Sequence, residues 1–180
     1  MRIIGGIFKS RIFRPGKNFK ARPTTDFARE NLFNILNNRY EFDNKKVLDL
    51  FAGTGSISFE FVSRGCENIT CVELDRFHYN FICSVIETLD VKRFVRAVNS
   101  DVFKYISRSH EQYNIIFADP PYELKQLAEI PDLILNGTLL PDDGLLILEH
   151  GKTNDFSAHP YFRELRTYGS VHFSFFSREK

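Results

Sequence analysis

Tryptophan is absent from this sequence of 180 residues, and methionine and cysteine are scarce, with one and three residues. The cysteines are odd in number and lack the paired spacing of a zinc site, so we expect free, buried thiols in a cytoplasmic protein. No two histidines have ligand spacing with an acid or a cysteine, and no metal site is predicted. Long apolar runs and an apolar N-terminal signal are also missing, so no membrane association is expected. The cysteines are Cys66, Cys71 and Cys83.

Acidic residues are missing from the beginning of the chain. Residues 1–22 hold seven of the 24 lysines and arginines, and the first acid is Asp26, so the rest of the chain is acidic overall. A basic arm on an acidic body is typical of a protein that holds a polyanion by one end, with a solvated basic tail as the alternative. The candidate polyanion contacts in this arm are Arg2, Lys9, Arg11, Arg14 and Arg22.

Apolar residues alternate with these cations, which argues against a solvated tail. They predict two short strands joined by a bend at Gly5-Gly6 and folded onto the body. We therefore divide the chain into a basic β-hairpin extension, residues 1–22, and an α/β domain, residues 23–180. The apolar residues are Ile3, Ile4, Ile7, Phe8, Ile12 and Phe13.

A helix is predicted directly after the arm, because apolar residues recur with helical spacing from position 27 to position 36. Thr24 or Thr25 would cap this helix, and Asp26 would sit favourably in its first turn. A helix N-terminus beside Arg22 is also a site for a phosphate or a carboxylate. Both roles are compatible, so Arg22, Thr24 and Thr25 remain candidate contacts to a nucleic acid.

A glycine-rich turn follows the first buried strand, in the stretch from Val47 to Gly55. The order of a strand, a turn at Gly53-Thr54-Gly55 and a helix resembles a dinucleotide-binding fingerprint. Ser58, however, stands at the position of the third glycine. Asp49 places an acid beside the turn, which suits a ligand with an ammonium group better than a pyrophosphate. The methionyl part of S-adenosylmethionine has such a group.

The second predicted strand, residues 68–73, ends in the acid Glu73, and the third, residues 94–98, is followed by Asp101. Glu73 could accept from both ribose hydroxyls of an adenosyl ligand, whereas Asp75 fits better as the cap of a helix over 76–89. Asp101 could accept from the adenine amine or could cap a helix over 102–109. The candidate cofactor-binding residues are Asp49, Gly53, Gly55, Glu73, Asp101 and Val102.

The fourth predicted strand ends in Asp119-Pro120-Pro121-Tyr122. Two prolines stop the strand and give a stiff turn at the carboxyl end of the sheet, where ligands bind in open α/β folds. The Asp119 carboxylate and the Pro120 carbonyl could accept both N–H bonds of an exocyclic amine, while Tyr122 stacks on the base. The turn resembles the signature of nucleic-acid amino-methyltransferases; the alternative is a proline-rich loop with Asp119 as a turn residue.

The remaining sequence predicts scaffold. We expect a helix over 123–140 interrupted by Pro131, a strand over 145–149, and a hairpin of strands 163–168 and 170–177. Glu149 and His150 end a strand on the ligand side without an assigned role. The whole predicts a Rossmann-like methyltransferase fold, with a mostly parallel seven-stranded sheet, helices on both faces and a C-terminal antiparallel hairpin.

Four segments together resemble the RsmD family, in which they have the same order and spacing. They are residues 1–6, 22–26, 49–55 and 119–122, and Gly5 stands where a serine is common. The resemblance implies methyl transfer from S-adenosylmethionine to the N2 amine of one guanine in 16S ribosomal RNA. We expect a cytoplasmic monomer that acts on this RNA within a partly or fully assembled 30S subunit. A DNA adenine-N6 methyltransferase and a non-catalytic RNA-binding assembly factor are the alternatives.

Overall fold

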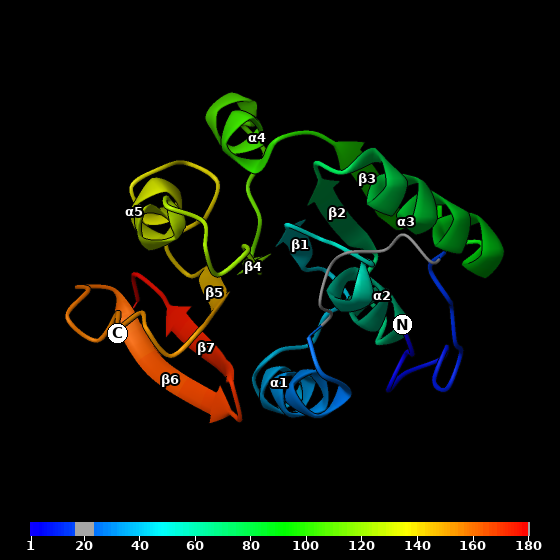
Figure 1. Ribbon diagram of the computed structural model, residues 1–180, viewed down its shortest axis with the longest axis horizontal. Coiled ribbons are helices and arrows are strands. Elements are labelled where there is room, and N and C mark those ends of the chain that lie inside the picture. Colours follow the sequence, from blue (N-terminus) through cyan, green and yellow to red (C-terminus); the bar gives the residue numbers. More distant parts are fainter. Residues whose placement is uncertain (17–23, 180) are drawn as a thin grey trace.

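Five parallel strands and an antiparallel pair form one sheet in the computed structural model, which describes residues 1–16 and 24–179. The strand order is β3-β2-β1-β4-β5-β7-β6, with β7 antiparallel to both of its neighbours (Figure 1). This arrangement confirms the predicted fold class. The strands are β1 Lys46–Leu50, β2 Asn68–Glu73, β3 Val95–Asn99, β4 Ile115–Ala118, β5 Leu145–His150, β6 Phe162–Tyr168 and β7 Val171–Phe176.

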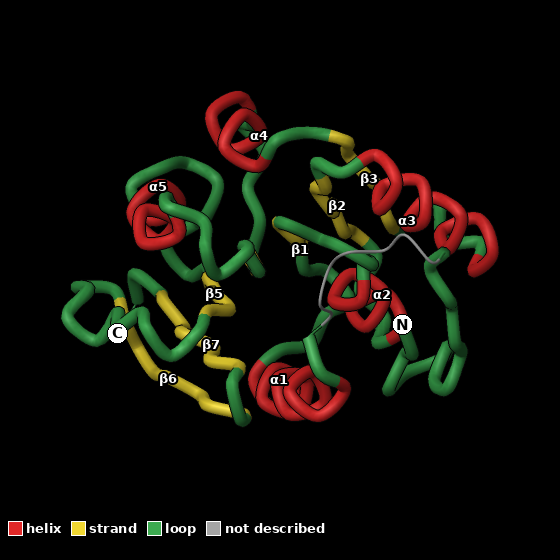
Figure 2. Tube along the Cα trace, in the orientation of Figure 1, coloured by secondary structure: helices red, strands yellow, loops and turns green. Residues whose placement is uncertain are grey.

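Helices cover both faces of this sheet. One face packs against α1 Asp26–Arg39, α2 Ser56–Ser63 and α3 Arg76–Leu89 (Figures 1 and 2). The other face packs against α4 Val102–Arg108 and α5 Ile130–Leu135. The central strands β1, β4 and β5 are buried along most of their length, because each of their faces is covered by helices.

The predicted helix starts are confirmed by their caps. Thr25 caps α1 by accepting from the Ala28 amide at 3.2 Å, and Asp75 caps α3 by accepting from the amides of Phe77 and His78. Each such cap contributes about 1 kcal/mol to helix stability. The Asp75 side chain thus serves as the N-cap of α3.

The predicted helix over 123–140 is wrong in extent and in the role of Pro131. Only a short 3-10 turn, η1 Leu127–Glu129, and α5 are helical there. Pro131 lies in the first turn of α5, where a missing backbone N–H breaks no helical hydrogen bond. The leucines that extended the helical pattern, Leu139 and Leu140, are instead buried from a loop.

The two strands predicted in the arm are reduced to a single bridge between Arg2 and Ile12. Bends and turns occupy residues 5–10, and part of this stretch bonds to α2 instead of to its own chain. The Ile7 amide donates to the Ser63 carbonyl at 2.7 Å. A Cβ on Gly6 would lie 1.8 Å from that carbonyl oxygen, so only glycine permits this approach.

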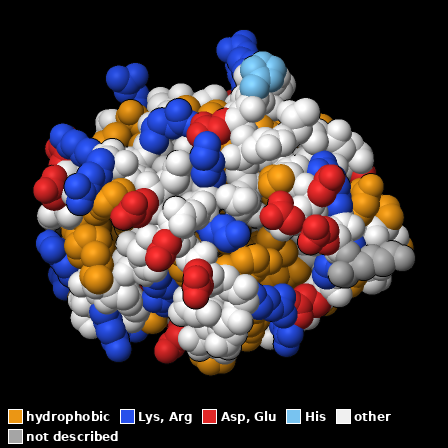
Figure 3. Space-filling model, turned by 180° about the vertical axis from the view of Figure 1, so that it is seen from behind, with side chains coloured by type: hydrophobic (Ala, Val, Ile, Leu, Met, Phe, Trp, Pro, Cys, Tyr) orange, Lys and Arg blue, Asp and Glu red, His pale blue; other side chains and the backbone are white. Residues whose placement is uncertain are grey.

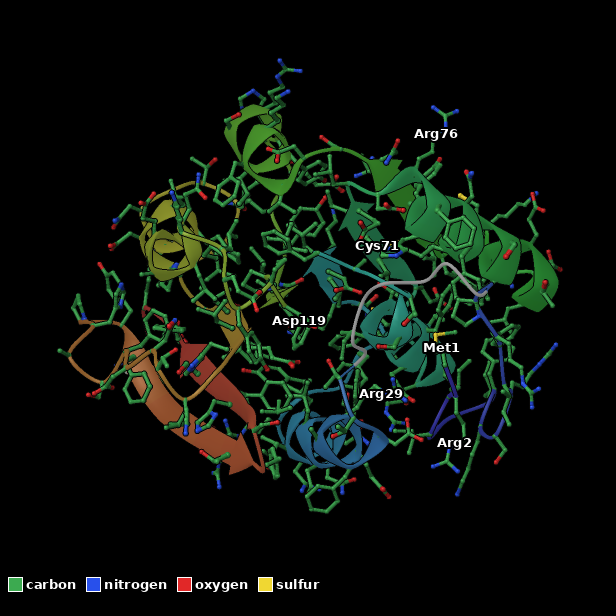
Figure 4. All side chains as sticks on the ribbon, in the orientation of Figure 1. Met1, Arg2, Arg29, Cys71, Arg76 and Asp119 are labelled. Atoms are coloured by element: carbon green, nitrogen blue, oxygen red, sulfur yellow. The ribbon has the colours of Figure 1, made fainter. Side chains whose placement is uncertain are left out.

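A buried ion-pair network fastens the arm to the body. The Glu60 carboxylate accepts from the amides of Ile4 and Gly5 and pairs with Arg64 at 3.1 Å and with Arg29 at 3.7 Å. Arg29, which is also buried, donates to the Arg2 carbonyl at 2.7 Å (Figure 4). Deletion of the arm would leave Glu60 without these amides, so charge changes on the arm's surface are the cleaner test of its role.

The cysteines are free, as predicted. Cys66 and Cys71 are buried, and burial raises the pKa of the Cys66 thiol to about 11. Cys83, on α3, is only half-buried, so the expectation that all three are buried is wrong for this residue. Within residues 1–16 and 24–179, no helix has the length and apolar character needed to cross a membrane.

Candidate active site

A left-handed turn connects β1 to α2 at the carboxyl edge of the sheet. Phe51, Gly53 and Gly55 have φ values of 61°, 56° and 72°. A positive φ is costly for a residue as bulky as phenylalanine, so the turn holds local strain. A Cβ on Gly55 would lie 2.8 Å from the Phe59 ring, whereas at Gly53 the nearest atom is 3.9 Å away. The backbone at Gly53 is therefore open to a ligand.

Asp49 lies behind this turn, with an exposed fraction of 1%. Its Oδ2 accepts from the Ser58 amide at 3.1 Å and from the Ser58 hydroxyl at 2.7 Å. The serine at the third glycine position therefore holds the acid. Burial raises the pKa of Asp49 to about 7, against the opposing effect of the Ser58 hydrogen bonds.

Glu73 ties the turn to the end of β2. Its Oε2 accepts from the Gly53 amide and its Oε1 from the Asp75 amide, both at 2.7 Å. A carboxylate offers about four acceptor positions, so capacity for two ribose hydroxyls remains. The contact with Gly53 was not foreseen from sequence, because it joins residues 20 positions apart.

Asp101 and Val102 lie at the next strand end. Asp101 caps α4 by accepting from the Lys104 amide at 2.9 Å, which is the structural role foreseen for it. Its contact with adenine stays a prediction. The Val102 side chain is buried in the core, so only its backbone is placed to reach a ligand.

The residues around the turn fit S-adenosylmethionine. Two carboxylates, Asp49 and Glu73, flank a glycine backbone that leaves room for a ligand. Acids of this kind suit a ligand that carries an ammonium and a sulfonium group, and they oppose a diphosphate. The carboxylate of Glu73 adds acceptors for sugar hydroxyls.

Asp119 begins the second half of the site, beside the turn. Its amide donates to the Leu50 carbonyl at 3.3 Å, and its side chain is partly exposed near the centre of the molecule (Figure 4). Pro120 is buried, and Tyr122 is 40% exposed. A Cβ on Gly151 would lie 3.0 Å from the Tyr122 ring, so the ring packs directly against this backbone.

Glu149, at the end of β5, is the site residue that sequence reasoning missed. Its Oε2 accepts from the Thr24 hydroxyl at 2.7 Å and its Oε1 from the Tyr122 hydroxyl at 3.2 Å. The Thr24 hydroxyl also lies 3.5 Å from Asp119 Oδ2. Burial, and then the charges of Glu149 and Asp49, raise the pKa of Asp119 well above its ordinary value. The sequence held one signal for Glu149. The next predicted strand after the one that leads to Asp119 also carries an acid near its end.

The candidate nucleic-acid contacts fall into three groups. Thr24 is buried in the cluster with Glu149, and Thr25 caps α1. Arg2 pairs with Asp26 at 2.8 Å. The third group is exposed on the arm and consists of Lys9, Arg11 and Arg14. Arg22 lies outside the described residues.

Opposite charges are interspersed on the face seen from behind the view of Figure 1. Among the described side chains drawn there, Lys and Arg alternate with Asp and Glu instead of gathering into a patch of one sign (Figure 3). Such a surface offers a polyanion little net attraction. The exposed cations of the arm therefore remain the main candidate contacts.

Comparison with known proteins identifies the family. The sequence profile described as Conserved hypothetical protein 95 matches residues 1–177. Ribosomal RNA small subunit methyltransferase D of Escherichia coli K12 is 31% identical over 182 residues, which cover 99% of this chain and 90% of that protein. The chain belongs to the RsmD family. The resemblance seen in the sequence is thereby confirmed.

Solved structures agree with membership of the RsmD family. The Escherichia coli protein yhhF is 31% identical, and the two structures superpose with a TM-score of 0.84 over 99% of this chain and 98% of that one. A protein complexed with SAH is 20% identical, covers 83% of this chain and 48% of its own, and shares the fold with a TM-score of 0.64. The chain is a methyltransferase that depends on S-adenosylmethionine.

Replacement of Glu73 tests the cofactor half of the site. In Glu73→Ala we expect affinity for S-adenosylmethionine to fall by tens of fold, because two charge-assisted contacts contribute about 2–3 kcal/mol. Calorimetric titration measures this affinity. Asp75→Asn is the matched control, since it removes a neighbouring charge but keeps a cap for α3. Unchanged affinity in a folded Glu73→Ala protein would contradict the assignment.

The pKa of Asp49 predicts a pH-dependent affinity. Raising the pH from 6 to 8 ionises this acid, whose pKa is about 7, and the carboxylate attracts a cationic ligand. Affinity for S-adenosylmethionine should therefore increase with pH, by up to roughly tenfold. Asp49→Asn keeps an acceptor for Ser58 without the charge. Titrations of both proteins at the two pH values should differ, and an equal pH dependence would exclude a role for Asp49.

Proposed function

We propose that this protein transfers a methyl group to the exocyclic N2 amine of a guanine in the 16S RNA of the small ribosomal subunit. The observation that carries the proposal is the position of Asp119, Pro120 and Tyr122 at the end of β4, directly beside the glycine turn that ends β1. The exposed cations of the arm supply contacts for an RNA backbone. The related protein from Escherichia coli is itself a methyltransferase of the small subunit RNA.

The residues of the turn would hold and orient the amine. An exocyclic amine is a poor nucleophile because its lone pair is delocalised into the ring. Acceptance of its two N–H bonds by the Asp119 carboxylate and the Pro120 carbonyl favours a nitrogen with a localised lone pair. Tyr122, fixed by Glu149 and by the Gly151 backbone, offers a ring face for the base. S-adenosylmethionine supplies the methyl group, and alignment accounts for much of the rate.

A methyl-transfer assay tests this function. Tritiated S-adenosylmethionine is supplied with naked 16S RNA, with 30S particles that lack the modification, or with duplex DNA. We expect label in the RNA or in the particles, and N2-methylguanosine in a nuclease digest analysed by mass spectrometry. Methyladenine in DNA would establish the adenine-N6 alternative instead. No incorporation with any of these substrates would contradict the proposed function.

A further inference from the structure

A second carboxylate lies beside the one that receives the amine. β4 and β5 are parallel neighbours with Ala118 opposite Leu148, so the next residues, Asp119 and Glu149, lie side by side. Asp119 follows the end of β4, whereas Glu149 is still within β5 and pairs with Phe173 of β7. The Thr24 hydroxyl spans them, at 3.5 Å from Asp119 and 2.7 Å from Glu149. The mechanism described above uses Glu149 only to hold Tyr122.

The orientation of Glu149 is fixed before any base arrives. Its side chain is 3% exposed, and its two oxygens accept from different hydroxyls, those of Thr24 and Tyr122. These hydroxyls come from segments far apart in the chain, so the fold as a whole sets the position of the carboxylate. A carboxylate offers about four acceptor positions, so it can hold these hydroxyls and accept from a ligand N–H as well. A preorganised group of this kind recognises a ligand without reorganisation.

The edges of the nucleobases differ at the atom next to the exocyclic amine. In guanine the N2 amine lies between N1, which carries a hydrogen, and N3, which does not. In adenine the neighbour of the N6 amine is an unprotonated nitrogen, and the same holds for the N4 amine of cytosine. An ionised carboxylate can only accept hydrogen bonds. The Glu149 carboxylate therefore matches the N1–H of guanine and repels the lone pair at the same position of the other two bases.

We propose that Glu149 accepts the N1–H of the target guanine while Asp119 accepts from its N2 amine, so that Glu149 selects guanine over other amino bases. This assignment rests on the proposed function and adds the residue that determines its base specificity. A site built to bind an N–H group rejects analogues that lack it by large factors, because the buried acceptor is then left without a partner.

2-Aminopurine is the probe that isolates this contact. It keeps the N2 amine and the ring faces, but its N1 is an acceptor. After the methylated guanine has been mapped, small subunits are reconstituted with 16S RNA that carries guanine or 2-aminopurine at that position. We expect wild-type kcat/KM to favour guanine by at least about 100-fold. In Glu149→Gln the side-chain amide can donate to N1, so the preference should fall at least tenfold.

A control variant and an independent binding measurement separate the possible outcomes. Tyr122→Phe removes the hydroxyl that Glu149 holds, and its rates should change for both bases while the preference for guanine is kept. 2-Aminopurine also lacks O6, but this difference is the same for wild-type and variant proteins and cancels in the comparison. Fluorescence of the 2-aminopurine on titration with protein gives binding independently of turnover, and Glu149→Gln should bind this RNA more tightly than the wild type.

The result that would overturn the inference is an equal preference for guanine in wild-type and Glu149→Gln proteins. Glutamine has nearly the same shape and can bond to both hydroxyls, and circular dichroism verifies that the variant is folded. If the wild type forms N2-methylguanosine but both proteins prefer guanine equally, only the role of Glu149 is refuted and the proposed function stands. Absence of N2-methylguanosine with the wild type refutes the proposed function itself.

Discussion

Asp119→Ala should lower kcat by roughly 10²–10⁴-fold while affinity for S-adenosylmethionine stays within a few fold. The carboxylate touches the amine only when the base is bound and reacting, so its loss acts on the transition state. Single-turnover methyl transfer at saturating cofactor measures the rate, and calorimetry measures the affinity. A variant that keeps most of its kcat would show that the turn is structural.

The structure indicates that this substitution does not destabilise the fold, so a loss of activity can be assigned to the chemistry. Asp119 lies beside the buried carboxylate of Glu149, and the like charge is one cause of its raised pKa. Removal of one of two neighbouring charges relieves repulsion, so Asp119→Ala should melt at or above the wild-type temperature. Glu123→Ala, an equal change of charge at an exposed position four residues on, is the matched control and should retain activity. Asp119→Asn keeps one carbonyl acceptor and should lose less activity than the alanine variant.

Simultaneous reversal of Lys9, Arg11 and Arg14 to glutamate should weaken RNA binding by roughly 10²-fold or more at 50 mM salt. Each phosphate contact on a single strand contributes about 0.7 to the slope of log K against log salt, so three lost contacts flatten this slope by about two. All three side chains are exposed and outside the buried network of Glu60, so the fold should survive. Filter binding over a series of salt concentrations gives both quantities.

A control of equal charge separates local contacts from net charge. Arg93, Lys104 and Arg108 are also exposed and belong to other segments, the loop before β3 and α4. Their reversal changes the net charge by the same amount. If this control weakens binding as much as the arm variant, the RNA responds to overall charge. If neither variant changes affinity or slope, the arm is a structural flap and the RNA binds elsewhere.

Local patterns explain why much of the site was predictable. The turn at Gly53 and Gly55, the caps at Thr25 and Asp75, and the stop at Pro120 each depend on a few consecutive residues with strong conformational preferences. The helix over 123–140 failed for a related reason. Its apolar spacing fitted a helix, but burial against the sheet from a loop satisfies the same leucines.

By itself, the sequence determined the parallel α/β architecture, the glycine turn and the Asp119–Tyr122 turn, since buried strands, glycines with positive φ and prolines act through their immediate neighbours. Only the tertiary structure decided which distant groups the acidic side chains contact. Glu149 reaches Thr24 across 125 positions and Glu60 receives the arm across 55 or more, and these contacts exist because of strand register and helix packing. The glycine turn likewise needed Glu73, 20 residues on, to hold its amide. Such pairings depend on how distant segments stack, which no local pattern encodes.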